Sequence, residues 1–146
     1  MKGLSTRNLT RRSVPGVPFT KIAKAVLPTW ELSLVFVTPE EAKRLNKTLR
    51  KKTYVPNVLS YESSSKSGEV IICLSVAKAQ APEYGLPYTA FVGLLFIHAL
   101  LHLKGERHGT TMEKRERALL ARFVSIPTWP DESQQALTSA RTKRRS

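Results

Sequence analysis

The spacing of hydrophobic residues changes several times along the chain, and each spacing predicts a different element of secondary structure. Between Pro18 and Pro28, hydrophobic residues recur with the period of an α-helix, which predicts a short amphipathic helix over residues 19–26. Residues 32–37 alternate with a period of two instead, as in a largely buried strand. The first fifteen or so residues hold only sparse hydrophobic positions, so they predict no more than a weak edge strand.

Thr38 marks the start of the next predicted helix. Its side chain can cap backbone amides, Pro39 suits the first helical position, and Glu41 completes a capping box. We expect this helix to reach about Thr48. Residues 47–52 carry four basic side chains and no acid, and we interpret them as a basic loop.

Two β-prone runs follow, and together they predict two strands of one sheet. They occupy residues 58–61 and 70–74, and a connection rich in serine and glycine separates them at residues 63–68. Ser75 is then expected to cap a further helix, which fades near Pro82.

An uncharged segment over residues 88–103 predicts a buried central helix that ends at Gly105. It is shorter than the roughly 20 apolar residues that a membrane span needs. A last, charged helix is predicted over residues 111–123, with Glu113 and Glu116 as surface charges. Its core face should consist of Met112, Leu119 and Phe123.

These elements predict an α+β fold, in which helices flank a small mixed β-sheet and one of them is central and apolar. The chain has 146 residues, 41% of them hydrophobic, so one compact domain with a sizeable core is expected. We assign this domain to residues 1–125. Residues 126–146 are polar and end in a basic run, which predicts a disordered basic tail.

The charge is strongly positive, because 24 Lys and Arg stand against 11 Asp and Glu, a formal net charge of +13. This excess favours an anionic partner, with nucleic acid first, although a solvated basic surface would give the same count. Cys73 is the only cysteine, so no internal disulfide can form, and no apolar secretory signal begins the chain. Both features predict a cytoplasmic protein.

All three histidines lie within eleven residues, which is the most specific chemical signal in the sequence. On a helix, His98 and His102 project from one face about one turn apart, so both can reach a single cation. Gly105 allows the chain to reverse, which can bring His108 to the same ion. Three neutral imidazoles and no thiolate suit Zn²⁺ best, with a fourth position open for water, although nickel, copper or iron would also accept them.

The alternative for each histidine is a satisfied core residue on an apolar helix, which is the commoner role for a lone histidine. Two imidazoles buried among hydrophobic residues are costly unless their nitrogens are used, and three clustered histidines favour metal coordination. The position after His98 is Ala99, so the catalytic glutamate of the HExxH zinc proteases is absent and a peptidase is disfavoured.

The segment resembles the YbeY-type endoribonucleases, the rRNA maturation factors whose hallmark is H-x-x-x-H-x-x-G-x-x-H. His98, His102, Gly105 and His108 match this motif. The chain departs from the family at Ala99, where glycine is usual, and at residues 106–107, where tyrosine-aspartate is usual. From about Leu32 to Phe123, further similar blocks are residues 45–46 with Arg50, Pro56 with residues 58–60, and residues 68–72, 75–77 and 83–85.

The resemblance implies a zincin-like arrangement in which the metal opens into a basic groove. It implies a metal-dependent, single-strand-type endoribonuclease that acts in 16S rRNA 3′-end maturation and ribosome quality control, with rRNA and the small ribosomal subunit as partners. Arg50 would be catalytic, because its guanidinium can pair bidentately with phosphate oxygens. Backbone phosphate contacts are expected from the flanking cations Lys51, Lys52, Lys104 and Arg107.

The main alternative is a non-catalytic ribosome-binding assembly factor with a structural metal. The two hypotheses differ in the expected effect of replacing His108. A structural metal site would unfold on its loss, whereas a catalytic site would keep the fold and lose cleavage.

Overall fold

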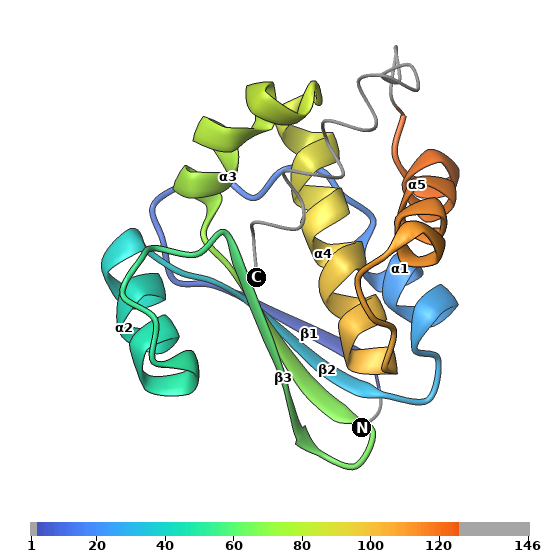
Figure 1. Cartoon of the computed structure of the whole chain (residues 1–146), viewed down its shortest axis with the longest axis horizontal. Coiled ribbons are helices and arrows are strands. Elements are labelled where there is room, and N and C mark those ends of the chain that lie inside the picture. The colour runs from blue at the N-terminus through green and yellow to red at the C-terminus, as the bar shows by residue number, and fades with distance from the viewer. Residues whose placement is uncertain (1–2, 126–146) are drawn as a thin grey trace.

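A computed structural model describes residues 3–125, in which five α-helices and four strands follow one another along the chain (Figure 1). The first half contains β1 (Gly3–Asn8), α1 (Phe19–Val26), β2 (Glu31–Phe36), α2 (Pro39–Arg50) and β3 (Val58–Ser64). The second half contains β4 (Ser67–Ile72), α3 (Leu74–Gln80), the 3₁₀ turn η1 (Ala81–Tyr84), α4 (Tyr88–Lys104) and α5 (Thr110–Phe123). The predicted tail, residues 126–146, lies outside the described residues, so its separation from the domain stays a prediction.

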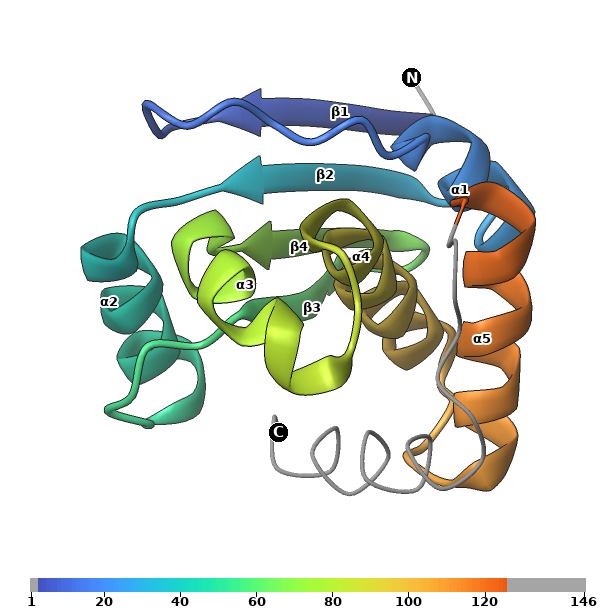
Figure 2. The same cartoon turned by 90° about the horizontal axis from the view of Figure 1, so that it is seen from above.

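The four strands form one mixed sheet in the order β1-β2-β4-β3 (Figure 2). β1, β2 and β4 are parallel, whereas β3 and β4 form an antiparallel hairpin. This arrangement confirms the predicted α+β class with a mixed sheet. It also leaves β1 and β3 as the two edge strands.

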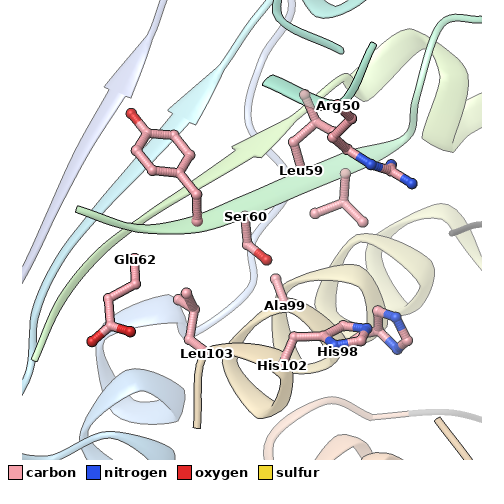
Figure 3. A pocket seen from close by; sticks show the side chains of 10 residues that line it. Arg50, Leu59, Ser60, Glu62, His98, Ala99, His102 and Leu103 are labelled. Carbon is pink, nitrogen blue, oxygen red and sulfur yellow. The ribbon is translucent and has the colours of Figure 1, made fainter. Parts of the chain in front are cut away.

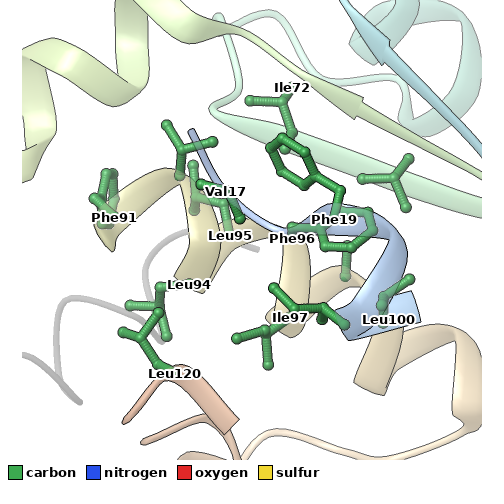
Figure 4. Packing of buried hydrophobic residues seen from close by; sticks show 14 of the residues in the cluster. Val17, Phe19, Ile72, Phe91, Leu94, Leu95, Phe96, Ile97, Leu100 and Leu120 are labelled. Carbon is green, nitrogen blue, oxygen red and sulfur yellow. The ribbon is translucent and has the colours of Figure 1, made fainter. Parts of the chain in front are cut away.

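Helix α4 is the centre of the hydrophobic core. Every residue from Ala90 to Leu101 is buried, as the uncharged run predicted. Phe96 of α4 packs edge-on against Phe19 of α1, with ring centroids 5.1 Å apart (Figure 4). Since successive strand residues point to opposite faces, Val70 and Ile72 join this core while Ile71 packs in a smaller cluster with Ala42 of α2.

Two local predictions about α2 have different outcomes. The Thr38 hydroxyl accepts a hydrogen bond from the Glu41 backbone amide, so the predicted cap is confirmed. The predicted basic loop over residues 47–52 is wrong in its first part, because α2 continues to Arg50. No glycine or proline interrupts these residues, and basic side chains are favourable in the last turn of a helix. The helix ends where Lys51 adopts a left-handed conformation, with φ of 57°.

The predicted cap at Ser75 is also wrong. α3 begins at Leu74, and Cys73 occupies the capping position without a side-chain hydrogen bond. Leu74 is fully buried, so packing in the core starts the helix two residues earlier than a Ser75 cap would.

Among the described residues, no single helix is long and apolar enough to cross a membrane. The helical segments Leu74–Tyr84 and Tyr88–Lys104 would together be long and apolar enough, but they meet at a bend of 104°.

Candidate metal centre and adjoining cleft

The structure brings His98, His102 and His108 together, each with one ligand nitrogen within 4.8 Å of the others. His98 and His102 lie one turn apart on α4, and their rings meet edge to face with centroids 4.7 Å apart. The Nε2 atoms of His102 and His108 are 3.0 Å apart. His98 is buried, while the other two histidines are half-buried, so the cluster opens toward solvent on one side.

The end of α4 explains how His108 returns to the helix. Gly105 has φ of 102°, a conformation that favours glycine, and its amide donates to the His102 carbonyl. The Glu106 amide donates to the Leu101 carbonyl, which completes a Schellman motif. The chain therefore reverses immediately after α4, as the sequence predicted from this glycine.

Glu116 of α5 is a part of the site that the sequence prediction missed. It was expected as a surface charge, but it is 4% exposed and its Oε2 contacts Nδ1 of His98. A signal for this was present, because Glu116 lies four residues from both Met112 and Leu120, on the buried face of the helix. A charged residue at a core position of an amphipathic helix points to a buried partner.

The preceding residue of α5 also reaches toward the site. The Arg115 guanidinium lies 2.6 Å from Oε2 of Glu106, in the segment between α4 and His108. The contact is an ion pair without a hydrogen bond to Oε2. Glu106 is thus engaged with α5.

A cleft with a volume of about 390 Å³ lies beside the histidines (Figure 3). Its walls are β3, the last turn of α2 and one face of α4. Ser60 points from β3 toward α4, and Arg50 lies at the α2 side. The lining residues include Arg50, Ser60, Glu62, His98, Ala99 and His102.

The cations predicted from the sequence take two different positions. Arg50 is half-buried and lines the cleft together with His98 and His102. The other four cations are exposed, and within the described part of the chain they lie outside the cleft lining; they are Lys51, Lys52, Lys104 and Arg107. Ser60 is a cleft residue that the sequence prediction did not single out.

The donor set fits a single Zn²⁺ ion. Around a tetrahedral zinc with Zn–N bonds of about 2.0–2.1 Å, ligand nitrogens lie roughly 3.3 Å apart. The His102 and His108 Nε2 atoms are near this separation at 3.0 Å, and His98 has its Nδ1 engaged with Glu116. Fold and site therefore define a class of α+β protein whose three-histidine cluster can hold one metal ion beside an open cleft.

Comparison with known proteins identifies the family within this class. A family model described as endoribonuclease YbeY matches residues 8–124, and the chain belongs to this YbeY family of endoribonucleases. This confirms the family that the histidine motif and the neighbouring sequence blocks resemble.

Individual relatives agree with this assignment. Endoribonuclease YbeY of Bdellovibrio bacteriovorus is 38% identical over 93 residues, which are 62% of this chain and 62% of that protein. The protein of the same name from Thiobacillus denitrificans is 36% identical over 70% of this chain and 76% of its own length. The match to the Bdellovibrio protein thus spans less than two thirds of that relative.

A solved structure supports the fold alone. The solution structure of TM1509 from Thermotoga maritima superposes with a TM-score of 0.60 at 18% identity, and the match covers 80% of this chain and 86% of that chain.

Proposed function

We propose that this chain is a metal-dependent endoribonuclease that cuts single-stranded regions of rRNA during maturation of the small ribosomal subunit and in ribosome quality control. The observation that carries the proposal is one juxtaposition. Three imidazoles whose ligand nitrogens lie within 4.8 Å of one another adjoin a cleft that also holds Arg50.

His98, His102 and His108 are the proposed ligands of one Zn²⁺ ion. When bound, the ion would supply a water of lowered pKa and polarise a phosphoryl oxygen. His98 and His102 line the cleft, so the cluster is accessible from that side, as a catalytic site requires.

Arg50 is the proposed catalytic cation. Its position in the last turn of α2 places the guanidinium in the cleft, where it can hold a substrate phosphate by two parallel hydrogen bonds. The same charge would offset the negative charge that develops at phosphorus. No lysine lines the cleft among the described residues, so Arg50 is its only strong phosphate-binding side chain there.

The substrate class follows from the charge and from the family. The formal net charge of +13 favours a polyanion, and the exposed cations Lys51, Lys52, Lys104 and Arg107 can contact its backbone. The matched relatives are named endoribonucleases, which favours RNA as the polyanionic substrate. A cytoplasmic location suits both this substrate and a chain with one cysteine.

The test is cleavage of a structured rRNA fragment by the zinc-loaded protein and by Arg50→Ala. We expect the unmodified chain to cut unpaired segments and the variant to lose cleavage while it keeps its metal. A chain that binds the fragment but never cuts it would overturn the proposal in favour of a non-catalytic assembly factor. A fragment with a 2′-deoxy nucleotide at the cleavage point would then show whether the RNA's own hydroxyl is the nucleophile.

A further inference from the structure

We propose that α5 is part of the metal centre, because Glu116 acts as a positioning residue that fixes the ring of His98 as a metal ligand. The inference rests on the proposed three-histidine metal site and adds a fourth residue to it, from a different helix. It does not depend on the RNA chemistry of the cleft.

The contact between the two side chains determines which nitrogen of His98 is available. The Glu116 carboxylate meets Nδ1 of His98, and each side chain is only 5% exposed. An ionised carboxylate can only accept hydrogen bonds, and the inference therefore assigns the proton to Nδ1. The lone pair of the neutral ring then lies on Nε2, which is the state that a metal ligand needs.

The burial of Glu116 indicates that its role is specific. Its neighbours on the same helix face, Met112 and Leu120, are 2% and 0% exposed, so an apolar side chain would suit this position. Burying a carboxylate there costs folding free energy unless a partner forms a hydrogen bond with it. A carboxylate that orients a ligating imidazole is a recurrent arrangement in metal sites, and it accounts for the acid at this position.

A second contact ties α5 to the other half of the cluster. Arg115 pairs with Glu106, which lies two residues before His108 in the reversing segment. Neighbouring residues of α5 therefore reach both the helical ligand His98 and the segment that carries His108. Because the Arg115 side chain is 45% exposed, its ion pair is expected to contribute less than the buried contact.

The experiment compares Zn²⁺ affinity in the full chain, in Glu116→Gln and in the matched control Glu113→Gln. Glu113 lies on the same helix and is half-buried, so both variants remove one negative charge from α5. Affinity is measured by competition with a chromogenic chelator, and the melting temperature is measured separately on metal-free protein. We expect Glu116→Gln to raise the Kd for Zn²⁺ by about 10- to 100-fold and Glu113→Gln to leave it within about twofold.

Equal Kd values for the two variants would overturn the inference, and so would an unmodified chain that binds no Zn²⁺. If Glu116→Gln does not fold, nitrogen NMR of the unmodified zinc-loaded protein gives the answer. The inference requires His98 to bind through Nε2 with a proton on Nδ1, and binding through Nδ1 would contradict it.

The outcome is separable from that of the proposed function. A chain with the expected Kd pattern and no RNA cleavage would retain the role of Glu116 and reject the nuclease. A chain that cleaves RNA, but whose Kd for Zn²⁺ is the same with and without Glu116, would retain the nuclease and reject the role of Glu116.

Discussion

The Nε2 atoms of His102 and His108 lie 3.0 Å apart, although His108 follows the end of α4 and belongs to no helix. Helix α4 carries only two of the three histidines, so the position of the third depends on the reversal at Gly105. The candidate metal site therefore depends on the end of the helix as much as on the helix itself.

Replacing Gly105 tests whether this reversal requires a glycine. Gly105→Ala should lower the free energy of unfolding of the metal-free protein by about 1–2 kcal/mol, because φ of 102° is unfavourable for a residue with a Cβ. A Cβ at this position meets no atom within 4 Å, so the cost is one of backbone conformation. Gly16→Ala is the control, since it is equally open and has no positive φ. Urea denaturation measures both, and equal effects would contradict the account.

Arg50→Lys tests whether Arg50 binds phosphate through its geometry or only through its charge. Lysine keeps the charge but cannot form the bidentate contact, so kcat/KM for RNA cleavage should fall by about 100-fold. Zinc content should stay unchanged. Arg44→Lys is the matched control, because Arg44 lies on the same helix, is exposed and pairs with Glu41. Cleavage by Arg50→Lys at the control's rate would exclude a bidentate role.

The exposed cations are predicted to supply affinity without sequence choice. In Lys51→Gln and Lys104→Gln, the slope of log affinity against log salt for single-stranded RNA should become shallower by about 0.7 per lost contact. The weakening should be similar for different RNA sequences. Lys24→Gln is the control, because α1 packs beside β1, at the opposite edge of the sheet from β3. If the slopes for Lys51→Gln and Lys104→Gln equal that for Lys24→Gln, the RNA does not contact Lys51 or Lys104.

The pKa of Tyr61 is raised, first by partial burial and then by the carboxylate of Glu69, its cross-strand partner on β4. The folded state thus holds this proton more tightly than the unfolded state. Stability from this group is fully present below the ordinary tyrosine pKa and is lost as pH rises through the folded value. Glu69→Gln should therefore shift one tyrosinate absorbance step to lower pH, whereas the exposed Glu31→Gln should not. An unshifted titration would contradict the influence of Glu69 on the pKa of Tyr61.

Much of the fold could be predicted because local chemistry and core packing agree. The bounds of α1 follow from hydrophobic spacing between two prolines, and the cap at Thr38 follows from its capping box. The prediction failed where the two disagree. Ser75 has the better capping side chain, but burial of Leu74 starts the helix earlier.

The candidate site was predictable only where its residues are close in sequence. The histidine motif specifies its own geometry through helical spacing and one glycine. Glu116 is 18 residues from His98, and their contact depends on how α5 packs against α4. The position of Ser60 opposite α4 likewise depends on the pairing of β3 with β4, which sequence spacing does not determine.

Metal content and RNA cleavage, measured together on the unmodified chain and on His102→Ala, test the central claim most directly. The account predicts about one zinc ion per unmodified chain, and loss of both metal and cleavage in the variant while the metal-free fold is kept. An unmodified chain without metal, or cleavage that is indifferent to His102, would contradict it.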